Sequence, residues 1–445
     1  MAGQQQMNRE RAIWDVVIIG GGLAGLTASV FLARGGKSVL VLEKSPATGG
    51  RAMSTRKEGG IFNLGPHALY KNGAGAAVWD ELGIQPHGEK PKAQGPLVFG
   101  KEQGSEKAVP MLQLFLGSAL SWPEKMELLR FYRGLRKIDT KEDALQRTSL
   151  QSYLESHIKS PVIRSAIGAL VRVSSYSNAP ERVSAGAVLG QLQMGQVLYL
   201  HGGWQKLVDE VQQKAEEAGV SFSCGASVHK IEGRSPEMSV TLKDGTVFAA
   251  RTVLSTAGPK ETAAMLGGGV LPEEIRRWDD LIPVHAACLD LHLSAMPNPK
   301  LTFSLGVDQP WYFSNHSYAA SLTDDPGHSV VHVMKYLPPE SMQDAAMVKH
   351  ELERFVDMIQ PGWREHVVNS RFMPHLTVTH ALVTASMGGI KGRPAPEVAS
   401  WPGLYVAGDW VGAEGMLLDA SLASARQAAA CIMGKKLQLV KAGIF

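Results

Sequence analysis

A glycine pattern between a short apolar run and a helix-like segment constrains this 445-residue chain more than any other feature. Residues 15–19 form an apolar run rich in β-branched side chains, which is typical of a buried parallel strand. The pattern Gly20-x-Gly22-x-x-Gly25 interrupts this run, and residues 23–34 follow with the composition of a helix. The order of strand, glycine turn and helix predicts the opening of an α/β domain.

The glycine turn has the spacing of a dinucleotide-binding site. Gly20 permits the tight turn, Gly22 lets a pyrophosphate approach the backbone, and Gly25 lets the helix pack on the strand. The helix N-terminus offers free N–H groups to the phosphates. A second predicted strand, residues 38–43, ends at Glu43, where an acid binds ribose hydroxyls and repels a 2′-phosphate. The turn alone does not separate NAD from FAD.

Three further segments are predicted from local patterns. Asp244-Gly245 is a hairpin turn between two short alternating runs. Residues 252–255 are predicted as another, separate buried strand, and residues 404–407 as the last strand of the chain. A long alanine-rich helix is expected to follow and to end near Met433.

The residues after the second predicted strand indicate that the dinucleotide is a flavin. In Gly49-Gly50-Arg51 the glycines let the backbone approach a ligand, and the arginine can pair with a phosphate or face a flavin. Residues 15–25, Glu43, this motif and residues 403–409 together resemble the flavin amine oxidase superfamily. That superfamily includes monoamine oxidases, protoporphyrinogen oxidases and phytoene desaturases. The resemblance implies that the chain is an FAD-dependent oxidoreductase.

Three other segments extend the resemblance, and the first of them is closest to the phytoene desaturase and protoporphyrinogen oxidase branch. Residues 62–67 resemble the segment that follows the arginine in that branch, although many relatives have Asp at the position of Asn63. Residues 201–207 resemble the central Gly-Gly motif of the superfamily, and Val228 matches the strand whose backbone contacts the adenine.

The resemblance also implies how the domains divide the chain. A Rossmann-type α/β domain for FAD would be discontinuous and would use residues 1–80, 202–276 and 395–445. A mixed α+β substrate domain would be inserted, as in flavin amine oxidases, and would use residues 81–201 and 277–394.

The C-terminal motif has a physical rationale as a flavin site. Asp409 would be repelled by a pyrophosphate, so we expect it to accept hydrogen bonds from ribityl hydroxyls or backbone N–H groups. The helix that opens near Gly415 can point its N-terminus at the flavin and stabilise the negative charge of the reduced form. The residues expected to contact FAD are Gly20, Gly22, Leu23, Ala24, Gly25, Glu43, Lys44, Gly50, Arg51, Gly65, Pro66, His67, Val228, Gly408, Asp409, Gly415, Met416 and Leu417.

The substrate is expected to be small and largely apolar. Monoamine-oxidase-type enzymes place a lysine near the flavin, but residues 283–288 contain none, and their aromatic cage would end near Met416. Apolar residues there suit a polyene, a terpenoid or a porphyrinogen. His67 and His285 are candidate catalytic bases or orienting groups, although a lone histidine is more often structural. Three functions stay open: a dehydrogenase or oxidase of C–C or C–N bonds, an amine oxidase that releases hydrogen peroxide, and a non-catalytic FAD-dependent partner protein.

Composition limits the partners. A net charge of +3 argues against nucleic acid as a partner, and the three cysteines lack metal-ligand spacing and are expected to be small buried residues. The polar N-terminus and the lack of an apolar run of ~18 residues predict a cytoplasmic protein.

Residues 111–137 combine apolar side chains with a basic face, so they could contact a membrane surface and admit a lipid-soluble substrate. An ordinary surface helix is the favoured alternative, with a core-facing stripe of Met126, Leu128, Leu129, Tyr132 and Leu135. The sequence does not determine the oligomeric state or the electron acceptor.

Overall fold

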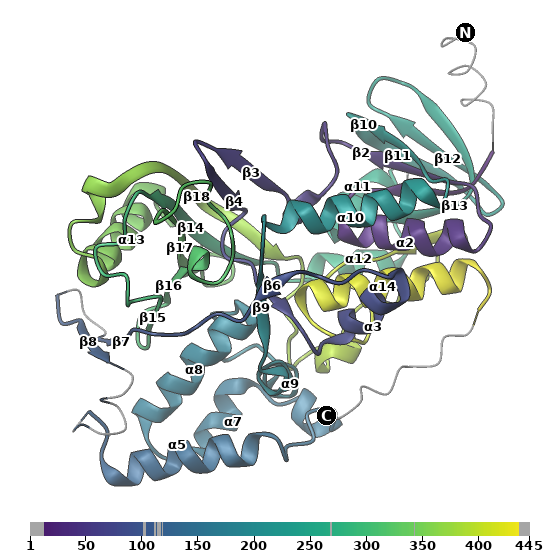
Figure 1. Cartoon of the computed structure of the whole chain (residues 1–445). Coiled ribbons are helices and arrows are strands. Elements are labelled where there is room, and N and C mark those ends of the chain that lie inside the picture. Colours follow the sequence, from purple (N-terminus) through teal and green to yellow (C-terminus); the bar gives the residue numbers. More distant parts are fainter. Residues whose placement is uncertain are drawn as a thin grey trace.

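Two seven-stranded sheets organise the molecule (Figure 1). The computed structural model describes residues 13–100, 104–110, 113, 117, 119–267, 269–341 and 343–435. Figure 1 shows the first sheet at the upper right, with α2, α10 and α14 beside it, and the second sheet at the left with α13. The fold is that of an α/β protein with a Rossmann-like sheet and a second, mixed sheet.

The first sheet carries the predicted βαβ opening. Its order is β10-β2-β1-β13-β12-β11, and β19 pairs with β13. The strands β10, β2, β1, β13 and β19 run parallel, whereas β11 and β12 extend the sheet in antiparallel fashion. The bounds are β1 Trp14–Ile19, β2 Val39–Glu43, β10 Ser221–Cys224, β11 Val228–Arg234, β12 Glu237–Leu242, β13 Val247–Ser255 and β19 Leu404–Val406.

The structure confirms the hairpin at Asp244-Gly245 but corrects the separate strand at residues 252–255. Those residues are the second half of β13, which leaves the hairpin and continues without a turn. Met238 to Thr241 pair with the first half of β13, while β1 and β19 pair with its second half. One long strand therefore joins the antiparallel and parallel parts of the sheet.

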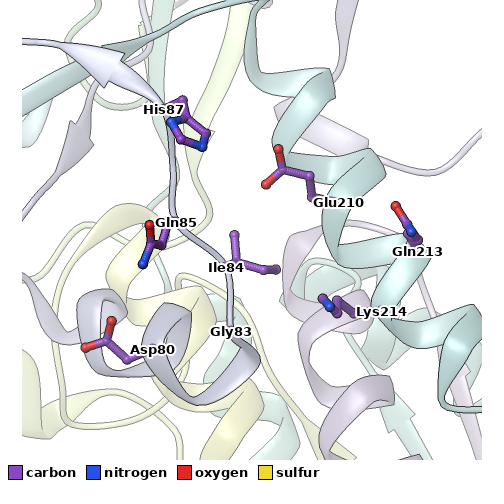
Figure 2. Close-up of a pocket in the computed structure, with 8 residues that line it drawn as sticks. All are labelled: Asp80, Gly83, Ile84, Gln85, His87, Glu210, Gln213 and Lys214. Carbon is purple, nitrogen blue, oxygen red and sulfur yellow. The ribbon is translucent and has the colours of Figure 1, made fainter.

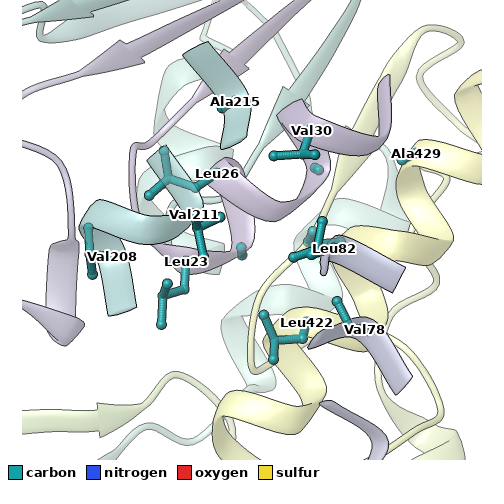
Figure 3. Close-up of a cluster of buried hydrophobic side chains, with 14 of the residues drawn as sticks. Leu23, Leu26, Val30, Val78, Leu82, Val208, Val211, Ala215, Leu422 and Ala429 are labelled. Carbon is teal, nitrogen blue, oxygen red and sulfur yellow. The ribbon is translucent and has the colours of Figure 1, made fainter. Parts of the chain in front are cut away.

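Four helices cover one face of the first sheet and bury a common core (Figure 3). They are α2 Leu23–Arg34, α3 Ala74–Leu82, α10 Trp204–Glu217 and α14 Leu417–Ile432. Leu26 and Val30 of α2 are fully buried, and the small residues Ala425 and Ala429 let α14 approach α2 closely. Each buried aliphatic side chain contributes about 1.5–3 kcal/mol to folding. The packing fixes the starts of all four helices at one end of the domain. On the other face lie α11 Pro259–Met265 and α12 Glu273–Arg276.

The second sheet has the order β18-β14-β17-β16-β15-β7-β8. Its neighbours are antiparallel except for β15 and β7. Helix α13, Ala345–Ile359, packs on one face. The strands are β7 Pro96–Phe99, β8 Lys107–Pro110, β14 Val284–Leu293, β15 Phe303–Gly306, β16 Trp311–Asn315, β17 Ser329–Tyr336 and β18 Val367–Thr379.

A group of helices lies at the bottom of the view in Figure 1 and packs around its own apolar cluster. It contains α5 Trp122–Leu135, α6 Asp143–Gln146, α7 Leu150–His157, α8 Pro161–Ser175 and α9 Ala185–Met194. The small strands that complete the fold are β3 Ser54–Lys57, β4 Gly60–Asn63, β5 Leu69–Tyr70, β6 Gly88–Glu89 and β9 Val197–Leu200.

Strands of the first sheet come from three separate parts of the chain. The predicted boundary after residue 80 falls inside α3, which packs on α14 and whose Glu81 pairs with Arg426 at 2.8 Å. The domain limits themselves stay predictions. Cys288 is buried as expected, but Cys224 and Cys431 are exposed, so the expectation of burial was wrong for these two.

Candidate active site

The turn between β1 and α2 presents an open helix N-terminus. Gly20 has φ +105°, and its N–H donates to Leu42 O at 2.8 Å, which ties the turn to β2. Gly22 is the N-cap residue of α2 and supplies no capping side chain, and the first turn contains no acid. The first-turn amides of Leu23, Ala24 and Gly25 therefore remain available to an anionic ligand.

Glu43 organises the neighbouring loop from the end of β2. Its buried carboxylate accepts from Gly21 N at 2.7 Å and from Ser45 N at 2.8 Å. A carboxylate oxygen has more than one lone pair, so ribose hydroxyls can still bind there. Ala226 N donates to Glu43 O at 2.8 Å, which places the start of β11, with Val228, beside this end of the sheet. Lys44 is exposed.

Arg51 and Asp409, expected as separate contacts to FAD, are bonded to each other. Arg51 lies in the short helix Gly50–Ala52 and donates from Nη1 to Asp409 Oδ2 at 2.5 Å and to Val378 O at 2.8 Å. His380 N donates to the other carboxylate oxygen at 3.2 Å. Burial opposes ionisation of Asp409, but Arg51 and His380 together hold its pKa below the ordinary value. The pair joins the N-terminal and C-terminal motifs.

Arg393, which sequence reasoning missed, shapes the loop that leads into α14. Its buried guanidinium donates to Gly412 O at 2.7 Å, Asp409 O at 3.2 Å, Glu414 O at 3.0 Å and Gly415 O at 2.9 Å. Burial lowers the pKa of Arg393 to about 10, and Asp409 opposes that shift. The guanidinium therefore stays charged at neutral pH and holds four carbonyls of one loop.

Helix α14 begins under strain. Met416 is its N-cap residue and offers no side-chain cap, and Leu417 has φ +54°, a left-handed conformation that costs a non-glycine residue about 1–3 kcal/mol. Met416 and Leu417 pack with Val284 and Leu382 in the apolar cluster of the helical group. Such strain persists only where the surroundings impose it, and it concentrates at functional sites.

The segment at residues 63–67 lies between the two sheets. Gly65 has φ +75°, and a Cβ there would be 2.9 Å from Cys288 Sγ, so only glycine fits against β14. Pro66 O accepts from Tyr176 Oη at 3.0 Å. The ring nitrogens of His67 lie 3.1 Å from Gly65 O and 3.1 Å from Arg51 O. Burial lowers the pKa of His67 to about 4. Both nitrogens face the backbone of the protein, so the geometry favours a positioning role for His67.

His285 is arranged differently. It is the second residue of β14, stacks on His375 with ring centroids 3.9 Å apart, and is partly exposed. Burial, followed by His375 and His380, lowers the pKa of His285 to about 4. Within the described residues no side chain or backbone group bonds to its ring nitrogens. The imidazole is therefore neutral at pH 7, and a ring nitrogen can accept a hydrogen bond from a bound substrate.

The four helices of the first core differ in how their N-termini are capped. Helices α3 and α10 begin at glycine N-caps, but each receives a cap from elsewhere: Asp419 Oδ1 accepts from Gly75 N at 3.0 Å, and Asn63 Oδ1 accepts from Trp204 N at 3.0 Å. No side chain caps α2 or α14. Two open helix ends, with Arg51 beside them, suit a long anionic ligand such as a dinucleotide.

A polar surface hollow of about 500 Å³ lies between the end of α3 and the middle of α10 (Figure 2). None of the residues expected to contact FAD lines it, so it is separate from the candidate site. Its lining residues are Asp80, Gly83, Ile84, Gln85, His87, Glu210, Gln213 and Lys214.

Comparison with known proteins identifies the family of the chain. The sequence profile described as flavin containing amine oxidoreductase matches residues 23–433. The chain belongs to this family. It is therefore an FAD-dependent oxidoreductase, and the phytoene desaturase and protoporphyrinogen oxidase resemblance lies within the same family.

The relatives differ in how much of the chain they match. The 4,4'-diapolycopene oxygenase of Methylomonas sp is 27% identical over 278 residues, which are 54% of this chain and 55% of that protein. The carotenoid 3,4-desaturase of Haloarcula japonica is 44% identical over 52 residues, which are 12% of this chain and 10% of that protein. The chain thus spans about half or less of the length of these relatives. The structure of cyclohexylamine oxidase from Brevibacterium oxydans superposes with a TM-score of 0.70 at 14% identity, covering 95% of this chain and 99% of that one, and so shares the fold.

The residues present fit the cofactor that the family implies. When bound, FAD accepts the hydride that leaves the substrate. The open ends of α2 and α14 would bind its charged parts, Glu43 would bind the ribose, and Asp409 would accept from hydroxyl groups. Arg51 would balance negative charge between them. Among the described residues, no helix is long and apolar enough to span a membrane, and no cluster of three His, Cys, Asp or Glu residues could hold a metal ion.

Proposed function

We propose that this FAD-dependent enzyme removes hydride from a carbon centre of a small, largely apolar substrate, at a C–C or a C–N bond. The observation that carries the proposal is the apolar junction at the start of α14. Met416 and Leu417, expected beside the flavin, pack with Val284, Leu382 and Val383 of the other part of the molecule. An apolar wall of this kind favours an apolar substrate.

The composition of β14 supports the same proposal. The strand reads VHAACLDLHL and contains no lysine where monoamine-oxidase-type enzymes have one. His285 is the polar residue nearest its start, and its neutral ring can act as a base or orient the substrate. The enzyme would thus rely on hydride transfer, with little acid–base help.

Two other functions are kept as alternatives. An amine oxidase that produces an imine and hydrogen peroxide agrees with the shared fold of cyclohexylamine oxidase. A non-catalytic FAD-dependent partner protein would use the same cofactor site without a substrate. Among the relatives, the 4,4'-diapolycopene oxygenase and the carotenoid 3,4-desaturase support the first proposal, whereas the L-amino-acid oxidase of Sistrurus catenatus edwardsii, 50% identical over 54 residues, supports the amine oxidase.

An anaerobic flavin-reduction screen tests the proposal. Purified protein is expected to be yellow, and a polyene, terpenoid or porphyrinogen is expected to bleach the flavin absorbance, while simple amines are not. His285→Gln should slow the bleaching by about 10²-fold if the imidazole serves as a base, whereas the matched His157→Gln variant at the end of α7 should not. If amines alone bleach the flavin, the first proposal is wrong and the protein is better described as an amine oxidase.

We also propose that α5 docks on an anionic membrane surface and admits a lipid-soluble substrate. The helix begins with a capping box, in which Glu124 accepts from Ser121 N at 2.8 Å. The expected core stripe was wrong for Leu129 and Tyr132, which are 38% and 47% exposed. Trp122, at the start of the helix, is 74% exposed. Leu128 and Leu135 of the expected stripe are buried, and Phe131 completes this buried face. Their spacing of three, four and seven residues places the three side chains together. Part of the predicted segment, residues 111–112, 114–116 and 118, lies outside the described residues.

Co-sedimentation with vesicles that contain anionic lipid tests this docking. Arg130, Arg133 and Arg136 are exposed beside the aromatic side chains, and each could contribute ~1 kcal/mol of attraction that weakens with salt. Replacing all three by Ser is therefore expected to reduce binding at low salt by at least tenfold. The matched control replaces the exposed residues Lys260, Arg276 and Arg277 by Ser. Equal, negligible binding by all proteins would contradict the proposal.

A further inference from the structure

Asp419 occupies an unusual place between two helix N-termini. It lies in the first turn of α14 and is 3% exposed. Its Oδ1 accepts from Gly75 N at 3.0 Å and so caps α3 from another helix. A Cβ on Gly73 would lie 1.7 Å from Oδ2, and one on Gly75 would lie 2.6 Å from Oδ1. The carboxyl therefore rests directly on the first turn of α3, where both positions require glycine.

The second oxygen of this carboxyl has no protein partner. Asp419 Oδ2 is buried and makes no hydrogen bond to any described residue. On α3, the groups that face the carboxyl are glycines. From β5, Tyr70 faces it, but burial in the first place raises the pKa of that phenol to about 12, so the phenol stays neutral, and it donates to Ser174 O at 3.1 Å. Arg426, further along α14, pairs with Glu81 instead.

A buried carboxylate without a cation is costly, so the protonated form is favoured. Burial raises the pKa of Asp419 to about 7, opposed by the hydrogen bond from Gly75. The group therefore changes charge near neutral pH, a range in which an ordinary aspartate is fully ionised.

The carboxyl is coupled to the turn expected beside the flavin. Gly415 approaches so closely that a Cβ there would lie 2.7 Å from Asp419 Cβ. Leu417, two residues before Asp419, is held at φ +54°. Movement of Asp419 would therefore move Met416 and Leu417. The positive end of α14 carries about half a unit charge, which a full negative charge in the first turn would more than offset.

We infer that Asp419 is a positioning residue that fixes the first turn of α14 on α3 and, by gaining or losing one proton, sets the charge that α14 presents to the bound flavin. The inference rests on the proposed function, because it requires FAD at the start of α14. A neutral Asp419 leaves the positive end of α14 intact and so favours the reduced, negatively charged flavin. An ionised Asp419 offsets that positive charge and makes the flavin harder to reduce.

The first experiment measures the two-electron reduction potential of the bound flavin by equilibration with redox dyes. It compares wild type, Asp419→Asn and the control Asp209→Asn, an exposed position on α10, between about pH 5 and about pH 9. Asparagine keeps the acceptor for Gly75 N and is neutral throughout. Below pH 7 the potentials of wild type and Asp419→Asn should agree. Above it the Asn variant should be easier to reduce by about tenfold in equilibrium constant, or about 30 mV. A difference that is absent, or equal at every pH, would overturn the inference.

The second experiment measures the unfolding of the FAD-free protein against pH. Between about pH 4 and about pH 7 the folded state holds a proton on Asp419 that the unfolded chain releases, so wild type should lose stability as the pH rises through this window, and more than Asp419→Asn does. Identical pH profiles of unfolding for the two proteins would show that Asp419 does not titrate in this range and would also overturn the inference.

The two experiments together separate the inference from the proposed function. If Asp419→Asn changes the stability but not the reduction potential of the flavin, the inference is rejected while the proposed function stands. A protein that binds no FAD would reject the proposed function itself.

Discussion

The variant Gly25→Ala is expected to lose most of its FAD on purification. A Cβ on Gly25 would lie 2.0 Å from Gly20 O and 3.2 Å from Thr256 Oγ1. The obstacle is backbone, which cannot swing aside, so α2 must move away from β1. Overpacking of this kind costs about 1–3 kcal/mol or more, and it displaces the free amides that would bind the phosphates. The measurement is the ratio of flavin to protein absorbance after gel filtration, together with the Tm.

The matched control is Gly168→Ala in the interior of α8, where a Cβ would meet no atom within 4 Å. Alanine in a helix interior is more stable than glycine by about 0.5–1 kcal/mol, so this variant should keep its FAD and unfold at a slightly higher temperature. If Gly25→Ala retained wild-type flavin content and Tm, the close packing of α2 on β1 could not be what places the cofactor.

The sequence predicted those parts of the fold that depend on neighbours along the chain. The ends of α2 were predicted as residues 23–34 because glycines stand on both sides, and β1, β2 and the hairpin at Asp244-Gly245 follow from similar local signals. The resemblance added the family, and with it the flavin. The pairing of β14 with β17 and β18 joins residues far apart in sequence, and no local pattern specifies that register.

Contacts within the site were less predictable, for a physical reason. Arg51 and Asp409 were expected from their motifs, but their mutual ion pair spans 358 residues and depends on the folded chain. Asn63 replaces an acid of many relatives, yet it still accepts from Trp204 N and Ser54 Oγ, because an amide oxygen serves as well as a carboxylate there. Asp419 carried no signal beyond its place in an alanine-rich helix. Only its burial against two glycines of α3 reveals it.

The role of Arg393 also depends on contacts that the local sequence does not show. A lone arginine between a lysine-glycine pair and a proline reads as a surface residue, since its four acceptors lie 16 to 22 positions away. Arg393→Met should destabilise the protein by about 3 kcal/mol or more, because each buried carbonyl left without a donor costs about 1–3 kcal/mol. The loop between Asp409 and Gly415 should then lose its shape, and FAD retention should fall with it.

The controls for Arg393 separate charge from geometry. Arg393→Lys keeps the charge but has no planar fork, so it cannot reach four carbonyls and should restore FAD retention only in part. Arg34→Met removes an exposed arginine that donates to two carbonyls at the end of α3, Glu81 O at 3.0 Å and Leu82 O at 3.3 Å, and should change stability by less than about 1 kcal/mol. Full rescue by lysine would show that charge beside Asp409 is what matters. Equal losses in Arg393→Met and Arg34→Met would contradict a special role for the loop, because both variants remove carbonyl donors and only one of them adjoins the start of α14.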